Sequence, residues 1–356
     1  MSDPLRVAFT LEQCWHDVPG GTAVAALEVA KRLTSRSDID LVGVAGRHRA
    51  APGPGFEPPT PLKYLPLARP WLYETWNRFE WPSVERATGP VDLCHSTTAV
   101  PAATRSPHIV TIHDIAFMHS PERFTRHGVK VMTRGLERCR TADLIMCPTK
   151  VTKGELIDAG FAANTIRVVP WGVNTVITDA TTSEQTLRPL LLPDEFVLFV
   201  GTIEPRKNLV ALAAATAMIG MPLVVAGAQG WGAAAVPPSA DVRFLGHVPA
   251  DVLSALYMTA SVFAYPSLHE GFGLPVLEAM AHGTPVVTSR GTATEEVAGG
   301  AAVLINPAEV ESIAAGLRTA LNNAPEFVRL GTQRSAACSW ETTADAIVEC
   351  YREVVA

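Results

Sequence analysis

The 356-residue sequence lacks the cysteine and histidine spacings that hold metal ions or redox pairs, and it carries little excess charge. Its six cysteines are scattered and form no CxxC pair, which is usual for thiols in a reducing compartment. Its ten histidines show no HExxH and no other zinc spacing, so we expect no metal site. The net charge of −6 argues against general nucleic-acid binding, although it allows a local basic patch.

The sequence shows neither a secretory signal nor a membrane span. Met1 is followed closely by the strand pattern of residues 5–10, with no apolar leader region. Residues 209–228 carry no charge over 20 positions, but Gly220 and Pro222 divide them into a buried helix and a strand. We therefore expect a cytoplasmic protein, and peripheral contact with the inner face of the membrane is an open alternative.

The first predicted strand is not followed by a G-x-G-x-x-G fingerprint, which disfavours a nicotinamide cofactor. Instead, a turn that contains Gly20 and Gly21 leads into a helical pattern, with Thr22 as the expected N-cap. A strand, a glycine turn and a helix are typical of the start of a doubly wound sheet.

Apolar runs of strand length alternate with helical patterns along the chain, which predicts an α/β fold with doubly wound sheets. The expected strands are residues 5–10, 41–45, 91–95, 108–113, 142–148, 166–170, 196–201, 223–226, 242–245, 261–265, 285–288 and 302–305. The proline-rich residues 51–70 are expected to form an irregular loop. A polar stretch separates two expected domains, residues 1–175 and 190–338, and residues 339–356 form an amphipathic C-terminal helix.

The most informative stretch, residues 267–288, places a glycine-rich turn before a short helix. Pro275 suits the first turn of that helix, where its missing N–H costs nothing, while Gly271 and Gly273 allow a close approach of the backbone to a ligand. The first amides of a helix lack intrahelical partners and attract phosphate. We therefore expect phosphate to bind at the amides of Phe272, Gly273 and Leu274.

Two glutamates flank this helix start, although carboxylates repel phosphate. Glu270 precedes the turn, and Glu278 lies about one turn inside the helix. A carboxylate is a strong acceptor for a hydroxyl, so both acids suit a ligand that carries phosphate together with several hydroxyls. This combination predicts a nucleotide sugar. The alternative is an ordinary capped helix with two surface glutamates.

A second motif, Gly-Thr-Ile-Glu-Pro-Arg-Lys-Asn-Leu at residues 201–209, follows a predicted strand and opens a helix. Functional residues of doubly wound sheets lie just beyond the carboxyl ends of the strands. At that position Arg206 can hold a diphosphate through its planar fork, and Lys207 can hold it as a point charge. The alternative is that the two residues are ordinary surface cations.

The two motifs together resemble the signature of the retaining glycosyltransferases of the GT4-like family, which have the GT-B fold. The resemblance implies two Rossmann-like doubly wound domains facing across a cleft, with the C-terminal helix crossing back to the first domain. It also implies that a hexose moves from a nucleotide diphosphate sugar to an acceptor hydroxyl without a metal or cofactor. The second motif looks most like that of mannosyl- and rhamnosyltransferases, so GDP-mannose is the expected donor. The expected acceptor is a glycan, a lipid-linked sugar or a small glycoside, in the synthesis of cell-envelope polysaccharide, glycolipid or glycosides.

The resemblance further implies the roles of single residues. The expected catalytic residues are Arg206, Lys207, Glu270 and His113. The expected donor-binding residues are Gly20, Gly21, Gly201, Val248, Phe272, Gly273, Leu274 and Glu278. The two cations would stabilise the leaving diphosphate, Glu278 would bind the ribose hydroxyls, and Glu270 would face the transferred sugar. No residue stands out as a covalent nucleophile, so we expect front-face attack in which the leaving phosphate helps to deprotonate the acceptor.

Two predicted features of the first domain stay open. His113 would reach the donor sugar, with Asp114 orienting it or the acceptor, or else His113 is an ordinary hydrogen-bonded residue at a strand end. Residues 122–140 carry six basic and two acidic residues. The simpler interpretation of that segment is a solvated helix face, and the alternatives are contact with anionic lipid or with a phosphorylated acceptor.

Two other functions are compatible with these patterns. One is a sugar-nucleotide epimerase or a phosphorylase of similar fold, against which the pair Glu270 and Glu278 argues. The other is a non-catalytic subunit that binds a nucleotide sugar without transferring it.

Overall fold

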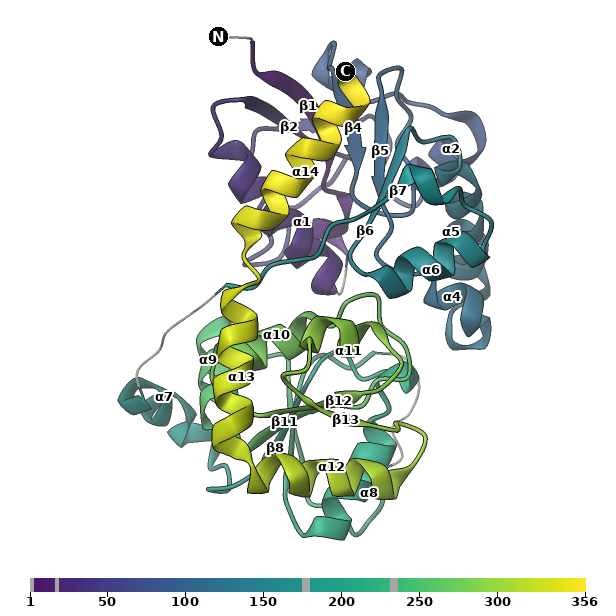
Figure 1. Ribbon diagram of the computed structural model, residues 1–356. Coiled ribbons are helices and arrows are strands. Elements are labelled where there is room, and N and C mark those ends of the chain that lie inside the picture. The colour runs from purple at the N-terminus through teal and green to yellow at the C-terminus, as the bar shows by residue number, and fades with distance from the viewer. Residues whose placement is uncertain (1–2, 17–18, 175–179, 231–235) are drawn as a thin grey trace. The chain divides into compact units, whose positions relative to one another are not determined.

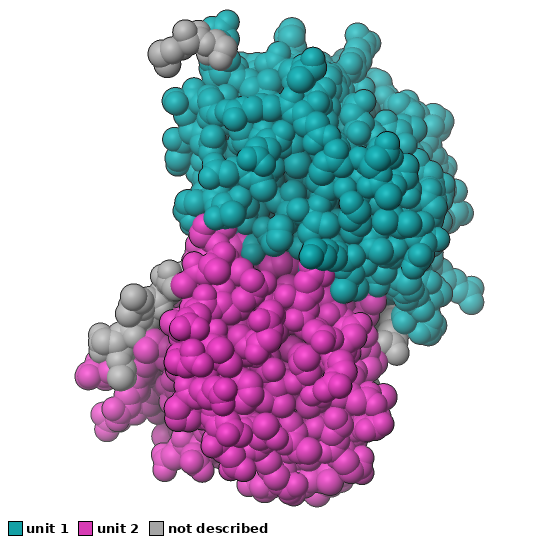
Figure 2. All heavy atoms as spheres, viewed as in Figure 1, with its two compact units in different colours: residues 1–171, 340–356 teal, residues 172–339 magenta. Residues whose placement is uncertain are grey.

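The computed structural model describes residues 3–16, 19–174, 180–230 and 236–356. The chain divides into two compact units (Figures 1 and 2). Unit 1 contains residues 1–171 and 340–356, and unit 2 contains residues 172–339. The last helix in the chain is therefore part of the first unit.

Unit 1 is built on a seven-stranded parallel sheet with the order β3-β2-β1-β4-β5-β6-β7. Its strands are β1 (Leu5–Thr10), β2 (Ile39–Ala45), β3 (Leu62–Tyr64), β4 (Leu93–Ser96), β5 (His108–Thr111), β6 (Leu144–Cys147) and β7 (Ile166–Val168). Six of them lie where apolar runs predicted them. The prediction that residues 51–70 form only an irregular loop is wrong, because β3 pairs with β2 there. That strand has three residues and two of them are exposed, so it carries no strand pattern.

The helices of unit 1 are α1 (Gly20–Thr34), α2 (Trp71–Phe79), α3 (Glu85–Thr88), α4 (Ala116–His119), α5 (Arg126–Cys139), α6 (Lys150–Asp158) and α14 (Trp340–Val355). Short 3₁₀ turns lie at Glu12–Trp15, Pro121–Arg123 and Ala163–Thr165. Thr22 does not cap α1, contrary to our expectation, because the helix already begins at Gly20. The Thr22 hydroxyl instead donates to the Pro19 carbonyl at 3.3 Å.

Helix α14 packs against α1, as the resemblance implied (Figure 1). Its buried residues recur at helical spacing and include Trp340, Ile347 and Tyr351. The exposed edge of the contact is lined by ion pairs, among them Arg32 Nε with Glu341 Oε1 at 3.0 Å. The apolar stripe supplies most of the stabilisation here, since exposed ion pairs contribute about 0–1 kcal/mol each.

Unit 2 contains a six-stranded parallel sheet with the order β10-β9-β8-β11-β12-β13. Its strands are β8 (Val197–Val200), β9 (Leu223–Ala226), β10 (Val242–Gly246), β11 (Val262–Tyr265), β12 (Val286–Ser289) and β13 (Val303–Ile305). Its helices are α7 (Ala180–Leu187), α8 (Leu209–Ile219), α9 (Ala250–Thr259), α10 (Leu274–Ala281), α11 (Ala293–Ala298), α12 (Val310–Asn322) and α13 (Ala324–Ala336), with 3₁₀ turns at Arg188–Leu190 and Pro205–Lys207.

Both sheets are doubly wound, because the strand order reverses at one point in each. In unit 1 the reversal lies between β1 and β4, and in unit 2 it lies between β8 and β11. Ligands of such sheets bind outside the carboxyl ends of the strands at the reversal. The uncharged run at residues 209–228 forms α8 and β9, as predicted. Within the described part of the chain, no helix is long and apolar enough to cross a membrane.

Candidate active site

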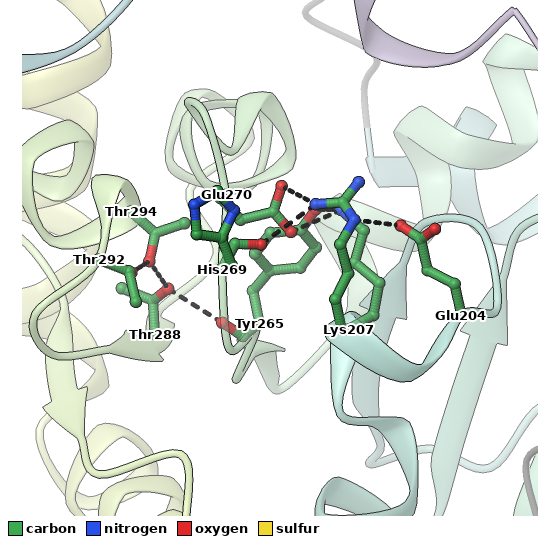
Figure 3. A network of polar contacts seen from close by, with 9 residues as sticks. Glu204, Lys207, Tyr265, His269, Glu270, Thr288, Thr292 and Thr294 are labelled. Atoms are coloured by element: carbon green, nitrogen blue, oxygen red, sulfur yellow. Dashed lines mark hydrogen bonds and ion pairs between the residues drawn. The ribbon is translucent and has the colours of Figure 1, made fainter. Parts of the chain in front are cut away.

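The candidate site lies at the point of unit 2 where the strand order reverses. Because β8, β11 and β12 are parallel neighbours, the loops that follow them leave the same edge of the sheet. The loop after β8 carries Arg206 and Lys207, and the loop after β11 carries Glu270 (Figure 3). A backbone hydrogen bond of 2.8 Å from the Leu268 amide to the Arg206 carbonyl ties the two loops together.

Glu270 is the centre of this site, because each of its carboxylate oxygens pairs with a different cation. Lys207 Nζ donates to Oε1 at 2.7 Å, and Arg206 Nη1 donates to Oε2 at 2.8 Å (Figure 3). Arg206 Nε also pairs with Glu204 Oε1 at 2.7 Å. The site therefore contains two cations and two carboxylates, and its charge is balanced.

Burial and charge act in opposite directions on this cluster. Burial alone would raise the pKa of Glu270, but the charges of Arg206 and Lys207 outweigh it and lower that pKa to about 2. Burial and the neighbouring Arg206 lower the pKa of Lys207, and the Glu270 carboxylate opposes them. Glu270 thus stays ionised over the ordinary pH range and fixes the positions of both cations.

The two cations differ in exposure. The Lys207 side chain is 8% exposed, and its ammonium donates to the Tyr265 hydroxyl and lies 4.7 Å from the centre of that ring. The Arg206 side chain is 22% exposed. Arg206 is therefore the cation that a ligand can reach. Lys207 is buried and shares the partner Glu270 with Arg206.

The helix start after Glu270 has the predicted form. Helix α10 begins at Leu274 with Pro275 in its first turn, and Gly273 precedes it with φ of +94°. A Cβ on Gly273 would lie 2.6 Å from Thr294 Cγ2, so a larger residue does not fit. Phe272 and Leu274, on either side of Gly273, are both buried.

Three threonines that are joined by hydrogen bonds lie beside this turn. The Thr288 hydroxyl donates to the Tyr265 carbonyl at 3.0 Å and lies 2.8 Å from the Thr294 hydroxyl (Figure 3). Thr292 and Thr294 share a further hydrogen bond of 2.8 Å. These contacts link the ends of β11 and β12 to Thr294 of α11, which lies beside Gly273.

Glu278 lies in α10 and makes contact with α9. The Tyr257 hydroxyl donates to Glu278 Oε2 at 2.9 Å, and His282 Nδ1 lies 2.7 Å from the Glu278 carbonyl. Burial raises the pKa of Glu278, and the hydrogen bond from Tyr257 opposes this effect. Glu278 is half-buried, and its carboxyl group is held by Tyr257.

Comparison with known proteins identifies the family. The family model described as "Glycosyl transferases group 1" matches residues 185–335, and that described as "Glycosyltransferase Family 4" matches residues 19–176. The O-antigen chain mannosyltransferase B of Escherichia coli is 31% identical over 275 residues, which cover 68% of this chain and 70% of that protein. The chain belongs to this family of glycosyltransferases.

Two further proteins are similar to this glycosyltransferase over nearly its whole length. A D-inositol 3-phosphate glycosyltransferase of Acidothermus cellulolyticus is 28% identical over 95% of this chain and 86% of its own length. The Anabaena protein HepE, solved in complex with UDP and glucose, superposes with a TM-score of 0.73 at 19% identity. That match covers 98% of this chain and 100% of HepE, and it shows the GT-B fold.

Three predicted donor-binding residues of this glycosyltransferase are not part of the loops that carry the cluster. Val248 follows β10, the edge strand of the unit 2 sheet, and is half-buried. Gly20 and Gly21 are exposed at the start of α1 in unit 1. Gly201 directly follows β8 with φ of +149°, and a Cβ there would lie 3.8 Å from Lys207 Cε.

His113 and Asp114 belong to unit 1 and follow β5. His113 Nε2 donates to the Thr97 carbonyl at 2.8 Å, which leaves Nδ1 as the acceptor of the neutral ring. Burial lowers the pKa of His113. His113 Nδ1 is buried and has no hydrogen-bond partner among the described residues. Asp114 Oδ1 accepts from the Ala116 amide at 3.0 Å, so Asp114 holds the start of α4.

Two residues of the cluster were not singled out from the sequence, namely Glu204 and Tyr265. Glu204 stands within the second motif, two positions before Arg206, and is 3% exposed. Tyr265 is the last residue of β11, in the position where functional side chains of such sheets are found. Both positions follow from the rule about strand ends, but only the structure shows that each contacts a cation.

Proposed function

We propose that this glycosyltransferase moves a hexose, with mannose as the first expectation, from a nucleotide diphosphate sugar to an acceptor hydroxyl. The transfer would retain the anomeric configuration and require no metal and no cofactor. The observation that carries the proposal is the buried cluster of Glu270 with Arg206 and Lys207 at the point where the strand order of unit 2 reverses. The expected acceptor is a sugar hydroxyl in a glycan, glycolipid or glycoside.

The chemistry would be supported mainly by Arg206. As the bond between C1 of the sugar and the phosphate oxygen breaks, negative charge grows on the leaving diphosphate. A positioned donor at such a charge typically contributes about 3–4 kcal/mol, whereas a helix start contributes up to ~2 kcal/mol. We therefore assign the larger effect to Arg206 and the smaller to the amides at the start of α10.

The proton balance can be met without a further base. The acceptor oxygen would attack C1 on the face that the diphosphate leaves, and the acceptor proton would pass to an oxygen of that diphosphate. Glu270 would not act as a base or nucleophile, because its lowered pKa keeps it ionised and its contacts with two cations hold both carboxylate oxygens. Glu278 would bind hydroxyl groups of the ribose.

The similarities support the choice of substrates. HepE was solved with UDP and glucose, and the Escherichia coli relative is described as a mannosyltransferase. We keep GDP-mannose as the first donor and UDP-glucose as the second. The proposal includes a location at the inner face of the membrane and contact with anionic lipid through residues 122–140.

A panel of donors tests the proposal. GDP-mannose, UDP-glucose and the free nucleotides are added to the protein, and the melting temperature and slow donor hydrolysis are measured. A donor at a hundred times its Kd stabilises the folded state by about 2.7 kcal/mol, which is a shift of roughly 5–10 °C for a unit of this size. NMR of the product would show the anomeric configuration, and EDTA should leave turnover unchanged.

The outcomes separate this function from its rivals. If no nucleotide sugar raises the melting temperature, the proposal is wrong. Turnover that requires free phosphate and no nucleotide would indicate a phosphorylase. A donor that stabilises the protein but is never hydrolysed or transferred would indicate a non-catalytic binding subunit.

A further inference from the structure

Aromatic side chains gather at one edge of the unit 1 sheet, where β1, β2 and β3 end. Because these three strands are parallel neighbours, their carboxyl ends lie at the same edge. Trp15 is the last residue of the 3₁₀ turn that follows β1, His48 follows β2, and Tyr64 is the last residue of β3. Ligands of doubly wound sheets bind outside this edge.

The Trp15 ring is held by two contacts. It stacks on the His48 ring, with the ring centres 4.3 Å apart and an angle of 6° between the ring planes. Its Nε1 donates to the Ala50 carbonyl at 2.9 Å. Tyr64, which is 53% exposed, meets Trp15 edge to face with 6.4 Å between the ring centres. Trp15 and His48 are half-buried, so these three residues form a preorganised aromatic platform.

A buried carboxylate lies at the start of the same 3₁₀ turn. Glu12 is 2% exposed, and its Oε2 accepts from the Gly46 amide at 2.6 Å and from His48 Nε2 at 3.0 Å. Glu12 Oε1 is also buried, but it has no hydrogen-bond partner among the described residues. His48 therefore connects the aromatic platform to a buried oxygen that can accept a further hydrogen bond.

Gln13, the next residue, carries a second buried acceptor of this kind. It is 1% exposed, and its Nε2 donates to Thr97 Oγ1 at 2.7 Å. The Thr97 hydroxyl itself donates to the Thr10 carbonyl at 2.6 Å, so it accepts from Gln13, and the Gln13 oxygen is directed elsewhere. Gln13 Oε1 is buried without a hydrogen-bond partner in the described part of the chain. Two such acceptors on consecutive residues indicate a place where a ligand or an ordered water donates.

We propose that the aromatic platform, together with Glu12 and Gln13, binds an oligosaccharide of hexoses, which is the sugar chain of the acceptor. One face of a pyranose ring consists mainly of C–H groups, which pack on the negative face of an aromatic ring. The hydroxyls at the edge of the sugar supply the donors that the two buried oxygens lack, directly or through a water. The Glu12 carboxylate disfavours a phosphate here. The inference rests on the sugar acceptor of the proposed function and adds a preference for acceptors longer than one sugar.

Saturation-transfer NMR of the full chain, in the absence of any nucleotide sugar, tests this surface. The probes are methyl α-mannoside, mannotriose and maltotriose, and GDP is added separately as a nucleotide probe. We expect at least one trisaccharide to bind about fivefold or more tighter than methyl α-mannoside, because further sugar rings add contacts with the platform. Trp15→Ala and Tyr64→Ala should each remove this advantage. Tyr64→Phe keeps the ring and should retain it.

Further variants separate binding from folding. Glu12→Gln places an amide where a carboxylate accepts hydrogen bonds and should weaken trisaccharide binding by about tenfold. Phe244→Ala, at a phenylalanine of unit 2 that is 46% exposed, is the matched control and should not change binding. In turnover with the trisaccharide as acceptor, Tyr64→Ala should raise the acceptor KM about fivefold. It should leave kcat and the donor KM unchanged, which a general structural defect would not do.

The inference is overturned if no trisaccharide binds the wild-type protein more tightly than methyl α-mannoside does. It is also overturned if Tyr64→Ala keeps the trisaccharide advantage, or if Tyr64→Ala weakens the binding of GDP instead. Should Trp15→Ala fail to fold, Tyr64→Ala decides the question, because Tyr64 is largely exposed. A trisaccharide advantage that Tyr64→Ala removes supports the inference even if no nucleotide sugar shifts the melting temperature, so the two proposals fail separately.

Discussion

The two units share a doubly wound topology, yet their buried titratable groups differ in charge near the point where the strand order reverses. In unit 2 that point holds ionised groups, with Glu270 paired to Arg206 and Lys207. In unit 1 the neighbouring strands β4 and β5 carry buried histidines that are kept neutral. Burial lowers the pKa of His95 to about 3 and that of His108 to about 4.

The difference follows from what stands next to each buried group. His95 is bonded to two hydroxyls, through Nδ1 with Tyr351 at 2.7 Å and through Nε2 with Thr111 at 2.8 Å. Glu270 instead faces two cations, which compensate the cost of its burial. The same fold therefore holds buried ionised groups in unit 2 and buried neutral histidines in unit 1.

The largest effect is expected from removing the centre of the charged cluster. Glu270→Ala leaves the buried Lys207 and the partly exposed Arg206 without their shared partner. Breaking a buried ion pair typically costs about 3–5 kcal/mol, so we expect up to about that loss in the free energy of unfolding of unit 2. Urea denaturation measures it, with hydrogen exchange at β8 and β11 as the local readout. The exposed residue Glu326 provides the control Glu326→Gln, which should change little. Full stability of Glu270→Ala would contradict the description of Glu270 as an anchor.

Removing the accessible cation should affect turnover more than folding. For Arg206→Ala we expect kcat to fall by about 10²–10³. The Lys207→Met variant should lose stability as well, because Lys207 is the buried member of the pair. Arg206→Lys should recover only part of the rate, since an ammonium lacks the fork. An unchanged kcat in Arg206→Ala would show that Arg206 does not take part in the reaction. The matched control is Arg329→Ala, which should leave kcat unchanged.

Acid should destabilise unit 1 before unit 2. A histidine whose folded pKa lies below the ordinary 6.5 contributes stability that is complete above about pH 6.5 and is lost as the pH falls towards its folded pKa. Between pH 7 and pH 5 the loss is about 2 kcal/mol each for His95 and His108. The folded pKa of Glu270 is about 2, below the ordinary 4.5. Its contribution to the stability of unit 2 is therefore complete above about pH 4.5 and is lost as the pH falls from there towards 2.

Hydrogen exchange followed by mass spectrometry can resolve this order. Peptides of β4 and β5 should lose protection between pH 7 and pH 5, after correction for the intrinsic exchange rate, while those of β8 and β11 should not. His127→Gln, at an exposed position of α5, should leave the profile unchanged. Equal loss of protection in both units would show that their electrostatic difference does not control stability.

The smallest effect is expected from the hydroxyl that links α14 to β4. Tyr351→Phe leaves the buried His95 Nδ1 without its partner, which should cost about 1–2 kcal/mol. The loss should appear as faster hydrogen exchange in both α14 and β4. Tyr64→Phe, at a tyrosine that is 53% exposed, should stay within about 0.5 kcal/mol of the wild type. If β4 exchanges at the wild-type rate, the hydroxyl is not a link between the two elements.

Most of the sheet framework could be predicted because buried parallel strands are continuous apolar runs bounded by turns. The exception, β3, is short and largely exposed, so it leaves no such run. The rule about strand ends also predicted that Arg206, Lys207 and Glu270 share one edge of a sheet.

The pairing of side chains could not be read from the chain. Lys207 and Glu270 are 63 positions apart, and no local pattern shows that both oxygens of Glu270 bind cations. The contacts of the basic segment 122–140 could not be predicted from the sequence either. Its charge was evident, but only packing distinguishes Arg134 and Arg138, which contact α2, from Arg126 and Lys130, which face solvent.

The return of α14 to unit 1 has a consequence for biosynthesis. Residues 172–339, which contain all of unit 2, leave the ribosome before α14, so unit 2 is complete while unit 1 still lacks its last helix. Until then the buried positions that contact Tyr351 and Trp340 are open to water. At about 5–20 residues per second the second unit takes roughly ten to thirty seconds to synthesise. The first unit to be translated is therefore the last to be finished, and it must avoid aggregation for that interval.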